Sequence, residues 1–340
     1  MAALPATQRE VRLVARPDGL PQLEHLKVVE TPLAAPGEDE VLVRNRFFQV
    51  FATLRLLITG VTQDTPFPKL SPGDTLVGAA IGEVVRAPED STLQPGDLVS
   101  HGRGWREYAV VPAGECARLD DEALPDPIAH LQRGWTAYAA LTRGVELRPG
   151  DTVFVSAGGS GIGAMAGVIA KRLGAGRVIA STSSRQKADR LVTELGYDEA
   201  IIRGAAPLTE QLAKAAPEGI DVFFDNVGGE QLQAAVEAAR PGARFVLIGA
   251  LSGQLSEHGT GTTAPVQLDS MPLIRKRIVM RGFSSDDFDD ESEWTERFGA
   301  WLRSGETVFP HARIKGIEHA PQALLDVIEG RHIGAVIVEL

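Results

Sequence analysis

The chain has 340 residues, of which 44% are hydrophobic and 23% charged, and a chain of this size is enough for about two globular domains. Its formal net charge is −11 and its longest basic run is Arg275-Lys276-Arg277, which argues against nucleic acid or an anionic membrane as a partner because both bind clustered positive charge. The only cysteine is Cys116, so an internal disulfide and a thiolate cluster for zinc are both excluded.

Targeting and metal-binding patterns are also missing from the sequence. No apolar run reaches 18 residues, and residues 1–11 lack the apolar core of a signal peptide, so we expect a cytoplasmic protein without a membrane partner. The histidines have no metal-ligand spacing, and we expect activity without a metal. They are His25, His101, His130, His258, His311, His319 and His332.

Residues 11–110 are predicted to form a β-rich domain. Short stretches alternate between apolar and polar residues, as in 41–45, and residues 104–111 read as a further strand. Pro-Gly-Asp occurs at 72–74, 95–97 and 149–151, each time before an apolar run. Proline followed by glycine suits the two central positions of a type II turn, so these tripeptides are predicted to be turns that precede strands.

A helical pattern begins at Asp126, where apolar residues recur at spacings of three and four from Ile128 to Tyr138. Strands then alternate with helices from residue 151 to about residue 303, and the last helix lies at about 290–303. This alternation predicts a doubly wound parallel sheet. The predicted strands are 152–156, 177–182, 199–202, 220–225, 243–249 and 277–283.

The stretch 151–171 reads as a strand, a glycine-rich turn and a helix in one run. Glycines let a pyrophosphate approach the main chain, and the helix that begins near Gly161 points free N–H groups and its positive dipole end at the anion. Small residues at 163, 167 and 170 share one helical face, which we expect to sit close against the strand. The stretch is therefore predicted to bind a dinucleotide through a turn that contains Gly158, Ser160, Gly161 and Gly163.

The end of the second strand of this unit bears on which dinucleotide binds. An NAD site usually has an acidic side chain there to hold the ribose 2′-hydroxyl, and residues 181–187 contain none. Hydroxyls, Ser183 among them, followed by Arg185 and Lys187 suit a 2′-phosphate through charge-assisted hydrogen bonds. The alternative is that these are solvated residues on an exposed first turn of a helix. Because the acid is missing, we expect NADPH.

Two later strands end beside the same turn. The strand at 220–225 runs into Asn226, and the strand at 243–249 runs into Gly249 and Ala250. Ligands of a doubly wound sheet bind at the carboxyl ends of its strands, so we expect these residues along the nicotinamide half of the cofactor. The alternative is a pair of ordinary turns.

Residues 334–339 predict a last strand that returns to the first domain. We therefore divide the chain into a first domain of residues 1–125 with 310–340, and a second domain of residues 126–309.

Together these motifs resemble the zinc-free medium-chain dehydrogenase/reductases over essentially the whole chain. The likeness rests on GDLV at 96–99, GWREYAVV at 104–111, WTAY at 135–138, the glycine turn, and IDVFFDNVGGE at 220–230. The branch that looks nearest contains the prostaglandin reductases and the alkenal or curcumin double-bond reductases. The resemblance implies a Rossmann domain with a GroES-like amino-terminal domain, a homodimer, and NADPH-dependent reduction of the C=C bond of α,β-unsaturated ketones or aldehydes by hydride transfer to the β-carbon.

The resemblance also implies a set of cofactor contacts. These are Thr136, Gly161, Ile162, Gly163, Ala164, Lys187, Asn226, Gly249, Ala250 and Phe283. At three further cofactor positions this chain departs from the family pattern: Ser160 replaces a glycine, Arg203 replaces a tyrosine on the adenosine side, and His332 replaces an asparagine.

The departure that concerns catalysis lies at 50–55, where the family's V-D-P-Y-M-R appears as V-F-A-T-L-R, without the aspartate and the tyrosine. A conjugate reduction needs hydrogen-bond donors for the developing enolate oxygen. The candidates are Gln49, Thr53 and Arg55, which we expect on a loop that faces the cleft. For each of them the alternative is an ordinary surface or packing residue.

Three other functions are alternatives to double-bond reduction. A short-chain dehydrogenase has its glycine turn at the start of the chain, whereas about 150 residues precede the turn here. A quinone reductase shares the two-domain plan and differs only in substrate. A cofactor-binding relative recruited to a non-redox role, as a cyclase or a structural protein, is suggested by the changed segment at 50–55.

Overall fold

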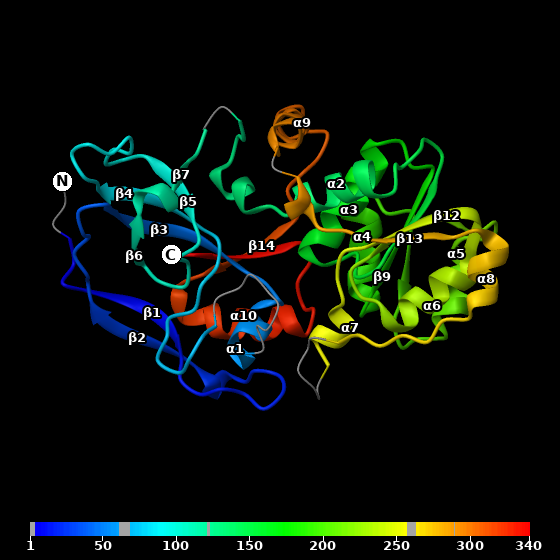
Figure 1. The fold of residues 1–340 in the computed structure, drawn as a ribbon, viewed down its shortest axis with the longest axis horizontal. Coiled ribbons are helices and arrows are strands. Elements are labelled where there is room, and N and C mark those ends of the chain that lie inside the picture. The colour runs from blue at the N-terminus through cyan, green and yellow to red at the C-terminus, as the bar shows by residue number, and fades with distance from the viewer. Residues whose placement is uncertain (1–3, 61–68, 121–122, 257–262, 289) are drawn as a thin grey trace. The chain divides into compact units, whose positions relative to one another are not determined.

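The computed structural model describes residues 4–60, 69–120, 123–256, 263–288 and 290–340. His258 and part of the first predicted domain therefore lie outside the described residues. The chain divides into two compact units (Figure 1): unit 1 contains Met1–Gln132, His311–Arg331 and Ala335–Leu340, and unit 2 contains Arg133–Pro310 and His332–Gly334. None of the described helices is long and apolar enough to cross a bilayer.

Unit 1 is built on β-strands, as predicted. Strands β1 (Thr7–Leu13) and β2 (Leu26–Pro32) pair antiparallel, and a seven-stranded sheet has the order β14-β15-β3-β4-β5-β7 with β6 paired to β3. The strands of the larger sheet are β3 (Glu40–Val50), β4 (Ala80–Arg86), β5 (Leu98–His101), β6 (Tyr108–Pro112), β7 (Ala117–Arg118), β14 (His311–Lys315) and β15 (Ala335–Glu339). Among the described residues of this unit, the α-helices are α1 (Leu54–Thr59) and α10 (Ala320–Ile328).

The last strand joins this sheet. Strand β15 runs parallel to β14 and antiparallel to β3, so that Val336 lies opposite Val50 and Val338 opposite Phe48. These side chains are buried in one core together with Trp105, whose ring lies 5.1 Å from that of Phe48. The prediction that the carboxyl-terminal strand returns to the first domain is confirmed.

The three Pro-Gly-Asp tripeptides form the same turn. Gly73, Gly96 and Gly150 have φ of 100°, 101° and 86°, which is the conformation that the third residue of a type II turn requires. In each turn the aspartate N–H donates to the carbonyl three residues earlier, and the aspartate carboxylate accepts from that residue's own N–H at 2.7–2.8 Å. The predicted turns are confirmed.

The junction between the units differs from the prediction. Residues 126–132 belong to unit 1, because Asp126 pairs with Arg313 at 3.1 Å and the Leu131 carbonyl accepts from the Gln49 side chain at 3.1 Å. The helix expected from Asp126 is also two helices. A 3-10 helix (Pro127–Leu131) ends at Gln132, whose ψ of 159° is extended, and α2 (Gly134–Ala139) follows.

Unit 2 contains six parallel strands in the order β10-β9-β8-β11-β12-β13. This is the doubly wound Rossmann order, and the predicted fold class is confirmed. The strands are β8 (Thr152–Val155), β9 (Arg177–Thr182), β10 (Glu199–Ile202), β11 (Ile220–Asp225), β12 (Ala239–Leu247) and β13 (Val279–Gly282). The rings of Phe154, Phe223 and Phe245 are buried side by side on the central strands, with centroids 5.0 and 5.4 Å apart.

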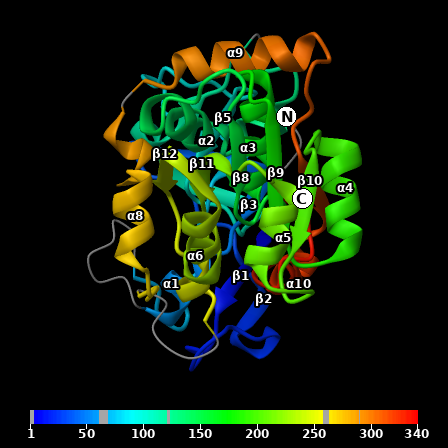
Figure 2. The ribbon, with the colours of Figure 1, turned by 90° about the vertical axis from the view of Figure 1, so that its right-hand side faces the viewer.

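Helices α3 to α8 each lie between two strands of unit 2 along the chain, whereas α9 follows β13. Figure 2 shows these helices beside the strands. Helix α3 contacts α2 and α4, whereas α6 contacts α5 and α8. Their bounds are α3 (Gly161–Arg172), α4 (Arg185–Leu195), α5 (Leu208–Ala215), α6 (Gly229–Ala238), α7 (Leu251–Gln254), α8 (Ser270–Lys276) and α9 (Ser292–Arg303).

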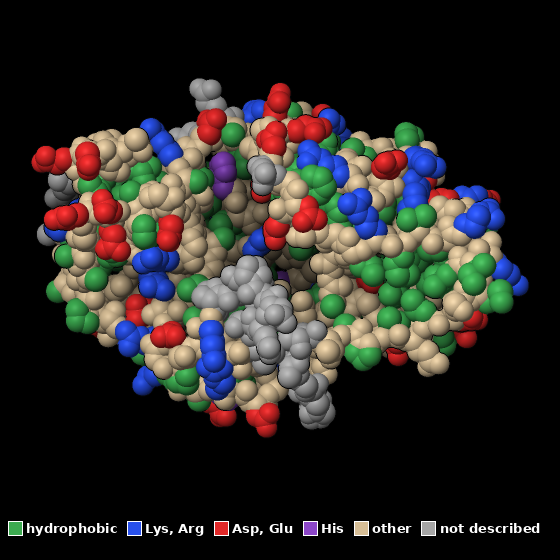
Figure 3. All heavy atoms as spheres, in the orientation of Figure 1, with side chains coloured by type: hydrophobic (Ala, Val, Ile, Leu, Met, Phe, Trp, Pro, Cys, Tyr) green, Lys and Arg blue, Asp and Glu red, His purple; other side chains and the backbone are tan. Residues whose placement is uncertain are grey.

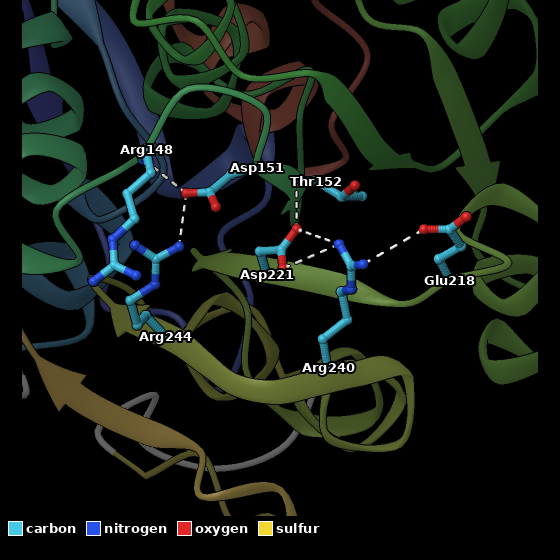
Figure 4. A network of polar contacts seen from close by, with 7 residues as sticks. All are labelled: Arg148, Asp151, Thr152, Glu218, Asp221, Arg240 and Arg244. Carbon is cyan, nitrogen blue, oxygen red and sulfur yellow. Dashed lines mark hydrogen bonds and ion pairs between the residues drawn. The ribbon is translucent and has the colours of Figure 1, made fainter.

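Ion pairs join the amino ends of the central strands (Figure 4). The Asp151 carboxylate, just before β8, accepts from Arg244 on β12 at 2.6 Å and from the Arg148 N–H at 2.7 Å. Asp221 on β11 pairs with Arg240 on β12 at 3.2 Å. The side chains of Asp151 and Arg244 are only 10% and 13% exposed, so the loss of one would leave the other charge poorly solvated.

We predict that Asp151→Ala lowers the free energy of unfolding by about 3 kcal/mol, because it leaves a nearly buried guanidinium without its carboxylate. The matched control is Glu194→Ala, which breaks the Arg190–Glu194 pair of 2.7 Å between side chains that are 50% and 48% exposed. That change should cost about 0.5 kcal/mol. Urea unfolding measures both, and equal losses would contradict the role given to burial.

Candidate cofactor site

The glycine-rich turn joins β8 to α3 at the carboxyl edge of the sheet in unit 2. The Ala157 N–H donates to the Ser181 hydroxyl and the Gly158 N–H to the Ser181 carbonyl, each at 2.9 Å. Ser160 caps α3, since its hydroxyl accepts from the Gly163 N–H at 3.1 Å. The helix begins at Gly161, as predicted, and its first N–H groups and positive dipole end suit an anion at this turn.

The backbone of the turn is packed too closely for a side chain at Gly163. A Cβ there would lie 2.2 Å from the Ala157 carbonyl oxygen, and a Cβ on Gly158 would lie 2.6 Å from that of Ala180. Ala157 itself has a φ of 49°, a conformation that a residue with a Cβ adopts only under constraint. The turn therefore has the bare, fixed backbone that a pyrophosphate needs.

Gly167 has a different role from the one predicted. A Cβ on Gly167 would lie 2.2 Å from the Tyr197 ring, and the Tyr197 hydroxyl donates to the Gly163 carbonyl at 2.7 Å. Gly167 therefore makes space for a buried tyrosine, whereas the prediction was that it lets α3 sit close against the strand. The tyrosine in turn fixes the first turn of α3.

The end of β9 lacks an acidic side chain and carries a buried hydroxyl. The Thr182 side chain is 7% exposed, and its hydroxyl has no hydrogen-bond partner among the residues that the structure describes. Ser183, the next residue, is exposed. Ser184 caps α4 by accepting from the Lys187 N–H at 3.3 Å. A buried hydroxyl that lacks a protein partner fits a site that a polar ligand completes.

Lys187 lies next to the glycine turn. A Cβ on Gly159 would lie 3.1 Å from the Lys187 ammonium nitrogen. Burial lowers the pKa of Lys187 to about 8, and the positive charges of Arg190 and Arg203 add to this shift. Arg203 is held at the end of β9, where its N–H donates to the Thr182 carbonyl at 2.9 Å. A partly desolvated ammonium among other cations is a favourable place for a phosphate.

A hydrogen-bond network fixes Asn226 between the ends of β8 and β11. The Asp225 carboxylate accepts from the Ser156 hydroxyl at 2.8 Å and from the Val227 and Gly228 N–H groups at 2.9 Å. The Asn226 side chain donates to the Ser156 carbonyl at 2.6 Å. Burial raises the pKa of Asp225, and these donors oppose the shift by stabilising the carboxylate.

Gly249 and Ala250 lie against Asn226. The Gly249 N–H donates to the Asp225 carbonyl at 3.2 Å, and a Cβ on Gly249 would lie 2.7 Å from the Asn226 carbonyl oxygen. Ala250 directly precedes α7, where the Leu251 N–H donates to the Asn226 carbonyl at 3.1 Å. The structure thus brings these three predicted residues together.

Thr136, Phe283 and His332 also belong to unit 2. The Thr136 hydroxyl is hydrogen-bonded to the Ser285 hydroxyl at 3.0 Å, and Phe283 follows β13 with its N–H donated to the Leu247 carbonyl at 3.0 Å. His332 lies in the short segment in which the Gly334 N–H donates to the Gly159 carbonyl at 3.0 Å. Each is therefore held within the unit that carries the turn. Their contacts with the cofactor stay a prediction.

The three candidate donors lie in unit 1 and differ in accessibility. Gln49 is on β3, is 3% exposed, and donates its amide to the Leu131 carbonyl at 3.1 Å. Arg55 is fully buried in α1. Thr53 directly precedes α1 and is half-buried. The expectation that all three lie on a loop is wrong for Gln49 and Arg55, which are in a strand and a helix.

Four residues of this site, Thr182, Tyr197, Ser156 and Ser285, are not among those that the sequence predicts. Thr182 stands within a run of hydroxyl residues, but nothing in the run distinguishes its buried hydroxyl from the exposed Ser183. Tyr197 packs where small residues on α3 leave space, so those small residues could have predicted a large side chain at this place. No group of three or more His, Cys, Asp or Glu side chains that could hold a metal occurs within the described part of the chain.

Comparison with known proteins agrees with this arrangement. The family model described as the N-terminal domain of oxidoreductase matches residues 9–119, and the model described as zinc-binding dehydrogenase matches residues 161–301. YfmJ of Bacillus subtilis, which is named an NADP-dependent oxidoreductase, is 32% identical over 98% of each chain. The NADPH-dependent curcumin reductase of Escherichia coli is 29% identical, over 96% of this chain and 95% of that protein.

A solved structure extends the likeness to the fold. The crystal structure of CurA from Vibrio vulnificus in complex with NADPH has a TM-score of 0.83 and 29% identity, and the match covers 97% of this chain and 98% of that one. The two units and the strand order are those of a medium-chain dehydrogenase/reductase. The chain belongs to this family, in the zinc-free branch that contains the curcumin, alkenal and prostaglandin reductases.

We predict that Lys187→Ala weakens NADPH binding by about 1.5 to 3 kcal/mol, the range for one charge-assisted contact to a phosphate. Binding of NADH, which lacks the 2′-phosphate, should change little. Calorimetric dissociation constants for both nucleotides test this. The matched control is Arg185→Ala, which removes an exposed cation at the start of the same helix and should have the smaller effect.

The pH dependence follows from the same side chain. With a pKa of about 8, the Lys187 ammonium is charged below pH 8 and loses its proton above it. The preference for NADPH over NADH should therefore be largest below pH 8 and decline as the pH rises through that value. Lys187→Arg, whose guanidinium stays protonated, should remove the decline. A preference that the wild-type protein keeps unchanged at alkaline pH would contradict the assignment.

Proposed function

We propose that this protein reduces the C=C bond of α,β-unsaturated ketones or aldehydes with NADPH. Membership of the family makes the protein an NADP-dependent oxidoreductase. The observation that carries the choice of cofactor is Lys187, half-buried beside Gly159 at the carboxyl edge of the sheet, with no acid at the end of β9. The substrate class rests on the likeness to double-bond reductases.

The residues of unit 2 have the properties that binding of this cofactor requires. The N–H groups at the start of α3 are available to a pyrophosphate, and Lys187 is placed to neutralise a 2′-phosphate. Asn226, Gly249 and Ala250 line the adjoining strand ends, where a nicotinamide is expected. When bound, NADPH supplies the hydride that is transferred to the β-carbon of the substrate.

The chain provides few side chains for the rest of the reaction. The enolate oxygen that develops needs donors, and among the three candidates Thr53 is the one that is neither buried in α1 nor hydrogen-bonded to Leu131. We therefore assign the stabilisation to backbone N–H groups, water and the Thr53 hydroxyl. We assign the proton that reaches the α-carbon to solvent, since segment 50–55 contains no acidic side chain.

The position of a transferred label tests the reaction. Deuterium from 4-deuterated NADPH should appear on the β-carbon of a saturated ketone when the enzyme turns over an enone. Mass spectrometry and proton NMR of the product locate it. Deuterium on the carbonyl carbon would make the protein an alcohol dehydrogenase by mechanism. Turnover of quinones but not of enones would make it a quinone reductase, and NADPH binding without transfer would favour the non-redox role.

Thr53→Val serves as the control for the assignment of donors. It removes the hydroxyl with little change in volume, so turnover should fall by clearly less than the ~100-fold typical for a lost oxyanion donor, and the label should stay on the β-carbon. A fall of about 100-fold or more would show that this one side chain carries the stabilisation. Gln49→Ala should act through stability, because its amide joins β3 to Leu131.

We also propose that two copies of the chain associate through the β13 edge of the sheet in unit 2. Strand β13 pairs only with β12 among the described strands, which leaves its other edge open. Hydrophobic side chains gather over the region of α8 and β13 (Figure 3), and Met271, Ile274 and Val279 are 54%, 67% and 60% exposed. An open strand with an apolar surround is suited to pairing with its own copy.

This proposal predicts a mass by light scattering of about twice the 36.3 kDa of the chain. Val279→Lys should shift the mass toward that of the monomer, because it places a charge on the paired edge. The matched control is Val308→Lys, since Val308 is also 60% exposed in unit 2 but is not part of β13. A wild-type monomer, or dissociation by both variants alike, would contradict the proposed interface.

A further inference from the structure

Five side chains of unit 2 form a continuous stack, which we call the arginine–aromatic column: Trp135, Arg143, Phe288, Phe283 and Arg281. The Arg143 guanidinium lies between two rings, 5.0 Å from the centre of Trp135 and 4.9 Å from that of Phe288. The Phe288 ring stacks on Phe283 at 5.5 Å with an interplanar angle of 24°. The Arg281 guanidinium lies 5.8 Å from the centre of the Phe283 ring.

A local irregularity of the backbone explains how Arg143 reaches this position. In a continuous α-helix a residue eight positions after Trp135 would lie about 80° around the helix from it. Helix α2 instead passes into a π-helical turn over Ala140–Gly144. Each residue of the wider π-helical turn rotates less about the helix axis than a residue of an α-helix. Arg143 therefore lies on the same face of the helix as Trp135. π-Helical turns of this kind are frequent at functional sites.

The column ties one loop to α2. Residues 283–288 follow β13 and pass α2 on their way to α9 (Figure 1). The loop has one further attachment, since the Ser285 hydroxyl is hydrogen-bonded to the Thr136 hydroxyl at 3.0 Å. Arg281, on β13 just before the loop, donates to the Arg143 carbonyl at 3.4 Å. Gly144 allows the close packing, because a Cβ there would lie 3.2 Å from the Phe283 ring.

This loop leaves the carboxyl end of β13, the same sheet edge that carries Asn226, Gly249 and Ala250. Phe283 and Thr136, two of the predicted cofactor contacts, are the residues that the column and the Ser285 bond hold in place. A loop that is ordered before binding spares the cofactor the entropy of ordering it.

We propose that Arg143 is a positioning residue for the cofactor: through its two ring contacts it holds loop 283–288 at the nicotinamide end of the bound NADPH. This inference rests on the proposed cofactor site. Arg143 itself acts through Phe288 and Phe283. The planar guanidinium is required, since only a flat cation stacks on both rings at once.

The test is nucleotide binding by Arg143→Ala. The dissociation constant for NADPH should rise about 10-fold, as expected for the loss of two cation–ring contacts, and that for NADH should rise by the same factor. The ratio between the two dissociation constants should stay unchanged, because the column belongs to the loop after β13, whereas Lys187 follows β9, which is four strands away in the sheet. Arg143→Lys should recover only part of the affinity. A changed ratio, or full recovery by lysine, would overturn the proposal.

The matched control is Arg297→Ala. The Arg297 guanidinium lies 5.7 Å from the ring of Tyr138, which is on the same helix as Trp135, and it pairs with the Glu293 carboxylate at 3.3 Å. This variant should lower the melting temperature about as much as Arg143→Ala while leaving the NADPH affinity within about 2-fold. If Arg297→Ala weakens NADPH binding as strongly, the effect is a general loss of stability and the proposal fails.

Two measurements separate this inference from the proposed function. Phe288→Leu should weaken NADPH binding like Arg143→Ala, and the double variant should be no weaker than either, since both remove one unit. Additive losses would overturn the proposal. In the protein without nucleotide, Arg143→Ala should speed hydrogen exchange of amides 284–288. Unchanged exchange would overturn the column's role even if NADPH binds, whereas faster exchange in a protein that binds no NADPH would sink only the proposed function.

Discussion

The backbone of the turn between β8 and α3 approaches itself so closely that a Cβ on Gly163 would lie 2.2 Å from the Ala157 carbonyl oxygen. This contact sets the start of α3, the direction of its free N–H groups, and the space for an anion. Three hydrogen bonds support it: the buried bond from the Tyr197 hydroxyl to the Gly163 carbonyl, and two partly buried bonds, from the Ala157 N–H to the Ser181 hydroxyl and from the Gly163 N–H to the Ser160 hydroxyl. The cofactor site therefore depends on side chains that lie behind the turn as well as on the turn itself.

The two edges of the sheet in unit 2 use charge in opposite ways. At the amino edge, Asp151 and Asp221 are matched by Arg244 and Arg240, so the charges neutralise one another and join the strands. At the carboxyl edge, burial and the neighbouring cations Arg190 and Arg203 lower the pKa of Lys187. A phosphate relieves that unfavourable arrangement. The first edge stabilises the fold, and the second is suited to bind a ligand.

The proposed reaction requires less of the protein than cofactor binding does. Segment 50–55 contains no acidic or phenolic side chain, and Gln49 and Arg55 are buried in unit 1. A conjugate reduction tolerates this, because the position of the reacting atoms matters more than an acid. The arginine–aromatic column fits the same requirement, since it orders a loop without contributing a reacting group.

The sequence alone determined the parts that depend on local pattern. Strand periodicity predicted the six strands of unit 2 and hence the Rossmann order, the Pro-Gly-Asp tripeptides predicted three turns, and Ser160 with its glycines predicted the start of α3, because each depends on a few neighbouring residues. Tertiary structure alone decided which side chains meet. Examples are the break at Gln132, the burial of Gln49 and Arg55, the packing of Tyr197 against Gly167, and the π-helical turn that aligns Arg143 with Trp135. These features arise from contacts between residues distant in sequence, or from a local strain that packing stabilises. The periodicity of the sequence predicts neither.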